Sequence, residues 1–134
     1  MRRILWVLVG VVAAFSASVF AAEQVTLDLD GLRRNAEAGD RVAQYNLGVI
    51  YESGRFGVPM DKGKAAALYR QAADQGYVNA QYNLGVLHLR GEGVKADQQA
   101  ALHWLRLAAA QQHSPALAAL KKLGVPTPEA SAGK

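Results

Sequence analysis

The chain has no cysteine, and this absence excludes several kinds of structure at once. No disulfide can form, so the folded part must be held together by packing alone. Zinc sites that depend on thiolates are excluded. An acylated cysteine, the mark of a lipoprotein, is excluded as well.

A concentration of charge of one sign is also missing. The 134 residues include 15 Lys and Arg against 11 Asp and Glu, which gives a formal net charge of +4. The basic residues are scattered among acidic ones, whereas a nucleic-acid-binding surface needs a stripe of Lys and Arg. The sequence therefore predicts no nucleic-acid partner.

The spacings that carry common catalytic and metal chemistry are absent too. The histidines, at positions 88, 103 and 113, form no H-x-x-x-H or H-E-x-x-H pair. Ser53 and Ser114 lack a suggestive His/Asp partner, and the glycine loops at 54–57 and 91–93 lack the Lys-Ser/Thr ending of a phosphate-binding loop. We therefore predict no catalytic residue, no metal site, no cofactor and no enzymatic activity.

One long apolar run does occur, at the N-terminus. Met1-Arg2-Arg3 is basic, residues 4–15 are apolar, and small residues lead to Ala21 and Ala22. This is the order of a secretory signal peptide, which we expect to span residues 1–21 with cleavage after Ala21 or Ala22. A retained membrane anchor is the alternative, because the run approaches the ~20 apolar residues that span a bilayer. We expect a periplasmic protein, with no stable membrane span once the leader is removed.

The rest of the chain is dominated by a repeat. The string AQYNLGV occupies residues 43–49 and again 80–86, and a further unit begins at Ala116. The likeness extends into a glycine loop and a second alanine-rich stretch, and such periods indicate stacked supersecondary units. The predicted organisation is a linker over 22–31, a repeat domain over 32–123 with units 43–79 and 80–115, and a disordered tail over 124–134.

Each unit has the pattern of two helices. Ala43, Leu47 and Tyr51 are four residues apart and form one apolar stripe, as do their counterparts Ala80, Leu84 and His88. A single pair of this kind cannot cover its own apolar face, whereas stacked pairs share a core.

Several residues mark the ends and contacts of these helices. Asp61 and Asp97 are suited to N-capping the second helix of each unit, and Gly76 to ending one in a left-handed conformation. Gly48 and Gly85 lie inside first helices, where glycine costs about 1 kcal/mol against alanine. We interpret both as points where the partner helix comes close. Trp104 is expected to pack between units.

This pattern resembles the Sel1-like repeat family of tetratricopeptide-like α-solenoids. The resemblance rests on A-x-x-x-L-G-x-x-Y at 43–51, G-x-x-G-V at 54–58 and K-A-A-A-L-Y-R-Q-A-A-D-Q-G at 64–76. His88 and Gln112 depart from the Tyr and Gly that the family pattern expects. The resemblance implies an all-α fold, a short right-handed α-solenoid of antiparallel helix pairs. It also implies an adaptor or scaffold role, which in exported bacterial members is often connected with the cell envelope.

The side of the first helices opposite the apolar stripe is the candidate binding surface. At 100° per residue, aromatic and aliphatic side chains recur there in both units, and such patches mark partner surfaces. We therefore predict that a protein or peptide binds a concave strip, termed here the first-helix strip: Tyr45, Asn46, Val49, Glu52, Tyr82, Asn83, Val86 and Leu89.

Alternatives stay open at this point. The two tyrosines of the strip can instead wedge between adjacent units, and the asparagines can bond a neighbouring interhelical turn. A cell-wall-related small-ligand binder or hydrolase, acting on β-lactams or peptidoglycan, is the alternative function. Weak self-association through the end of the repeat at Leu120–Leu123 is a further expectation.

Overall fold

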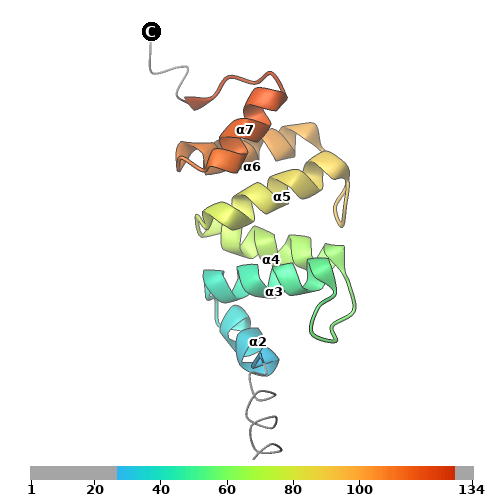
Figure 1. Ribbon diagram of the computed structural model, residues 1–134. Coiled ribbons are helices and arrows are strands. Elements are labelled where there is room, and N and C mark those ends of the chain that lie inside the picture. The colour runs from blue at the N-terminus through green and yellow to red at the C-terminus, as the bar shows by residue number, and fades with distance from the viewer. Residues whose placement is uncertain (1–26, 129–134) are drawn as a thin grey trace, which may run out of the picture.

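A computed structural model describes residues 27–128, which form a stack of six helices (Figure 1). The described residues contain no strand, so the predicted all-α class is confirmed. Neighbouring helices along the chain pack against each other, and the loops α3–α4 and α5–α6 project from the same edge of the stack. The helices are α2 (Leu29–Glu37), α3 (Arg41–Ser53), α4 (Lys62–Asp74), α5 (Val78–Arg90), α6 (Gln98–Ala110) and α7 (Ser114–Lys122).

The helix ends follow from the sequence chemistry. The side chains of Asp61 and Asp97 accept hydrogen bonds from backbone N–H groups in the first turns of α4 and α6, which confirms both predicted N-caps. Gly54 and Gly91 end α3 and α5 at φ 66° and 65°, a left-handed conformation that costs glycine little. Gly76 follows the C-cap of α4 at φ 79°. Each unit is thus delimited by the same devices.

The glycines inside the first helices mark close helix contacts, as predicted. A Cβ on Gly48 would lie 2.7 Å from the Tyr69 ring of α4, and one on Gly85 would lie 3.0 Å from Cγ of Leu105 on α6. Both distances are shorter than ordinary van der Waals contact, so a side chain at either position would require the facing Tyr69 ring or Leu105 side chain to shift.

The core runs through the whole stack. Tyr69, Leu84 and Leu87 are fully or almost fully buried in its central part. Trp104 of α6 belongs to the same cluster and is only 6% exposed, so it packs between units as expected. Each pair therefore shares its apolar face with the next, as a solenoid requires.

Two predicted boundaries differ from the observed ones. Helix α2 begins at Leu29, so the last residues of the expected 22–31 linker are helical. At the other end Val125, expected in a disordered tail, packs against a buried C-terminal cluster, and its N–H donates to the Leu120 carbonyl. This cluster consists of Leu105, Ala108, Ala109, Ala116 and Leu120. The predicted signal peptide with its cleavage site, and residues 129–134 of the tail, lie outside the described residues. Within 27–128 no helix combines the length and apolarity needed to cross a membrane.

The predicted self-association surface is smaller than expected. Leu120 is fully buried among the residues of the C-terminal cluster, because α7 turns it toward α6. Leu123 is 39% exposed. Leu120 is therefore a core residue and cannot offer an apolar contact to another chain without unfolding this end.

Candidate functional site

The first-helix strip is present on α3 and α5, but most of it is half-buried. Asn46 is exposed, whereas the other seven predicted residues have intermediate burial. Val42, one turn before Asn46, is 44% exposed and extends the accessible part of the strip. Sequence reasoning missed Val42, although its spacing of four from Asn46 would have placed it there.

The two tyrosines of the strip join adjacent repeats. The Tyr45 ring lies 5.1 Å from the ring of Tyr77, the residue that precedes α5. The Tyr82 ring lies 5.1 Å from that of His113, which precedes α7. The interplanar angles, 50° and 48°, are almost the same. On their inner side, Tyr45 and Tyr82 therefore wedge between adjacent units, as the alternative in the sequence analysis has it.

A polar cluster surrounds the first of these joints. The Tyr69 hydroxyl donates to Oε2 of Glu52 at 2.5 Å, and the Asn83 side chain hydrogen-bonds with Tyr45 and Tyr69. Burial, followed by the bond to Glu52, raises the pKa of Tyr69 well above its usual value. Burial likewise raises the pKa of Tyr45. Glu52 and Asn83 are thus engaged in holding α3, α4 and α5 together.

These contacts divide the predicted strip into two parts. Glu52, Asn83 and the inner faces of the tyrosines serve packing, whereas Asn46 and the outer edges of Val49 and Val86 face solvent. The expected bond from an asparagine to a neighbouring turn is replaced, at Asn83, by bonds to tyrosines.

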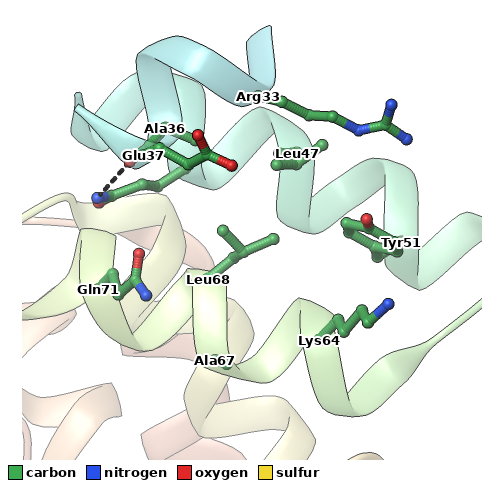
Figure 2. A pocket seen from close by; sticks show the side chains of 10 residues that line it. Arg33, Ala36, Glu37, Leu47, Tyr51, Lys64, Ala67, Leu68 and Gln71 are labelled. Atoms are coloured by element: carbon green, nitrogen blue, oxygen red, sulfur yellow. Dashed lines mark hydrogen bonds between the residues drawn. The ribbon is translucent and has the colours of Figure 1, made fainter. Parts of the chain in front are cut away.

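A separate pocket of about 460 Å³ opens between α2 and α4, with α3 as its floor (Figure 2). Its floor is apolar and is formed by Leu47 with Leu68 beside it, and Tyr51 closes one end. A volume of this size lies within the range of about 300–1,000 Å³ that small-ligand sites occupy. The strip prediction did not include any of these residues.

Charge is unevenly placed around this pocket. Figure 2 shows the Arg33 and Lys64 side chains at the end that Tyr51 marks, and Glu37 at the other end. The Lys64 ammonium lies 5.3 Å from the centre of the Tyr51 ring. Arg33 donates to Asp30 at 3.2 Å in a solvent-exposed pair. One end of an apolar pocket is thus cationic.

The candidate catalytic and metal residues have structural roles in the described part of the chain. The Ser53 hydroxyl donates to the Val49 carbonyl of its own helix at 2.7 Å. His113 caps α7 by accepting from the Ala116 N–H, and His103 lies edge-on to Trp104. Across residues 27–128 no group of three or more His, Cys, Asp or Glu side chains could hold a metal ion.

The architecture defines the class of protein as a short α-solenoid built from helix-pair repeats. The Sel1 repeat pattern matches residues 41–77 and 78–113, so the chain belongs to the Sel1 repeat family. Repeats of this family generally mediate protein–protein interactions and are generally non-catalytic scaffolds.

Solved structures support the same fold. The chain is 41% identical to a Sel1 repeat protein from Oxalobacter formigenes, with a TM-score of 0.67 over 69% of this chain and 26% of that one. It is 44% identical to a protective antigen of uropathogenic Escherichia coli with an SLR fold, with a TM-score of 0.62 over 69% of this chain and 20% of that one. Both likenesses confirm the predicted solenoid.

A curated relative is an uncharacterised protein of Neisseria meningitidis serogroup B. It is 33% identical over 109 residues, which cover 81% of this chain and 23% of the relative. The chain therefore spans about a quarter or less of the length of each of these three proteins.

Proposed function

We propose that the protein is an exported, non-catalytic interaction module that binds a protein or peptide of the cell envelope through the first-helix strip. The periplasm is the proposed compartment, on the strength of the basic, apolar and small-residue order of positions 1–21. Membership of the Sel1 repeat family supports a protein partner.

The observation that carries this proposal is the exposed part of the strip. Asn46 on α3 is exposed beside the partly exposed Val49, and Val86 on α5 recurs at the position of Val49. Close packing of the helix pairs accounts for Ala43, Leu47 and Gly48, which are buried, but not for an exposed amide. An exposed donor and acceptor beside aliphatic side chains is suited to an extended peptide, whose backbone needs both.

The test uses variants that alter the exposed part of the strip and leave the joints intact. Asn46→Lys combined with Val86→Lys places two long cations on it, whereas alanine at Tyr45 or Tyr82 would also loosen the stack. Affinity capture from a periplasmic extract, read by mass spectrometry, compares this double variant with the unaltered chain. We expect the double variant to capture at least about tenfold less of the partner than the unaltered chain does.

The matched control lies on another face. Gln99→Lys combined with Leu107→Lys adds the same charge at exposed positions of α6, and it should retain the partner. Full retention by the Asn46→Lys/Val86→Lys variant, with its helical circular dichroism unchanged, would show that the strip is not the binding surface.

A further inference from the structure

The pocket between α2 and α4 has a counterpart in the next repeat, and the counterpart is filled. Aligning the units places Leu68 of α4 at the position of Trp104 on α6, and Arg33 of α2 at the position of Arg70 on α4. In the second repeat the indole of Trp104 is buried against α4 and α5. In the first repeat the smaller Leu68 occupies the position, and a pocket of about 460 Å³ is open.

The filled site shows which group such a site accepts. The guanidinium carbon of Arg70 lies 5.4 Å from the centre of the Trp104 ring, within the range of a cation–π contact. Arg70 makes this contact while its Nε also pairs with Asp74 at 3.3 Å. Arg33 is paired with Asp30 in a comparable way. A guanidinium has five N–H donors and two open faces, so this pairing leaves Arg33 able to cover a ring.

The open site adds a second cation. Lys64 stands where the second repeat has Ala100, and its ammonium lies at the same end of the pocket as Arg33. Among the residues that line the pocket the one carboxylate is that of Glu37, at the opposite end. Asp30, which pairs with Arg33 at 3.2 Å, is not part of the lining. An incoming group with a negative charge beside an aromatic ring would therefore match both the cavity and its rim.

We propose that this pocket binds an aromatic side chain, best an indole, from an acidic segment of a partner peptide. The ring occupies the space that Trp104 fills in the second repeat, under the guanidinium of Arg33. A carboxylate next to the ring pairs with Lys64. This surface is formed by α2, α3 and α4 and uses none of the first-helix strip, so it is a second and independent binding site.

The experiment titrates small probes into the full chain and follows backbone amide signals by NMR. N-acetyl-tryptophanamide should shift the signals of Ala36, Leu47 and Leu68 saturably. It should bind about tenfold more tightly than N-acetyl-leucinamide. Acetyl-Glu-Trp-amide should bind at least about threefold more tightly than acetyl-Lys-Trp-amide. The absence of saturable shifts at these residues, or an equal response to both dipeptides, overturns the proposal.

Two variants make the result specific. Leu68→Trp supplies the ring from the chain itself and should weaken N-acetyl-tryptophanamide binding by about tenfold or more, whereas Leu68→Met should keep it within about threefold. Unchanged binding by a folded Leu68→Trp protein overturns the proposal. If that variant does not fold, the double variant Arg33→Glu/Lys64→Glu provides the test, because it must reverse the preference between the two dipeptides. An unreversed preference overturns the proposal as well.

Another occupant gives a different outcome. If the same signals shift as the protein concentration alone is raised, a second copy of the chain fills the pocket, and the proposal fails. The capture experiment with the strip variants does not depend on the outcome of the pocket experiments. The two surfaces are therefore tested separately, and either proposal can fail without the other.

Discussion

The two repeats share a frame but meet their neighbours through different side chains. At the first joint, between α3–α4 and α5, Tyr69 donates to Glu52 and bonds with Asn83. The matching positions of the second joint hold Leu105, Leu89 and Ala119, which pack as an apolar cluster. The frame thus depends on small and aliphatic residues at fixed places, while each joint can be polar or apolar as long as its groups are satisfied.

The second difference concerns the space between successive helices α2, α4 and α6. Trp104 closes the space between α4 and α6, whereas Leu68 leaves the space between α2 and α4 open. The two repeats therefore differ in how this space is occupied, at the position that holds Leu68 in one and Trp104 in the other. Repeats specify how helices stack, and variable positions specify what the surface can bind.

The largest expected effect comes from giving the second repeat the residue that the first repeat has at this position. Trp104→Leu removes the largest side chain of the central core, so we expect a loss of about 3 kcal/mol in the free energy of unfolding. Urea denaturation measures it. Because the substitution leaves an apolar cavity, added indole should raise the melting temperature of this variant by more than it raises that of the unaltered chain, as ligands do for engineered cavities.

A control on the same helix separates cavity formation from loss of helix surface. Leu107 is 39% exposed, so Leu107→Ala should cost less than about 0.5 kcal/mol and should respond to indole no more than the unaltered chain does. A loss below about 1 kcal/mol for Trp104→Leu, with no response to indole beyond that of the unaltered chain, would mean that the helices close over the gap and that the two repeats do not differ in this way.

The polar joint is tested by removing one hydroxyl. Tyr69→Phe keeps the ring against Gly48 but leaves Glu52 without its donor. A hydrogen bond to a charged group contributes about 1.5–3 kcal/mol, and half-buried Glu52 can recover part of this from water, so we expect a loss of about 1.5 kcal/mol. Equilibrium urea unfolding is the measurement.

Tyr82→Phe is the control at the second joint, where Leu105 stands at the position of Tyr69. Within residues 27–128 the Tyr82 ring contacts His113, and no hydrogen bond to its hydroxyl is seen. Its loss should therefore be below about 0.5 kcal/mol. Equal losses at the two joints would contradict the distinction between a polar and an apolar joint.

The frame could be predicted because it rests on local rules. The spacing of Ala43 and Leu47, the capping aspartates at 61 and 97, and the intrahelical glycines each have one physical reading, and each is confirmed. Gln112 stands where the family pattern has glycine, and it adopts the expected left-handed conformation at φ 60° despite its side chain. The stack therefore imposes this turn even on an unfavourable residue.

The surfaces were less predictable because they depend on the neighbouring unit. A helical wheel places Tyr45 away from its own pair's stripe, but it cannot show that Tyr77 of the next unit covers the ring. In the same way, an alignment of Leu68 with Trp104 does not reveal whether helices move together to fill the difference. Only the packed structure shows that the gap stays open.

The smallest effect that we predict concerns acid. His113 caps α7 with its neutral imidazole and packs against Tyr82, and burial lowers its pKa below the usual value of 6.5. The unfolded chain then binds the proton more readily than the folded one. The contribution of neutral His113 to the free energy of unfolding is therefore fully present above pH 6.5 and is lost as the pH falls below that value. The matched position of the first joint holds Tyr77, so the imidazole is particular to the second joint. His113→Asn keeps a side-chain cap without the charge, so its melting temperature should fall less between pH 7 and pH 5. An unaltered decrease would assign the acid sensitivity to other groups and remove this difference between the joints.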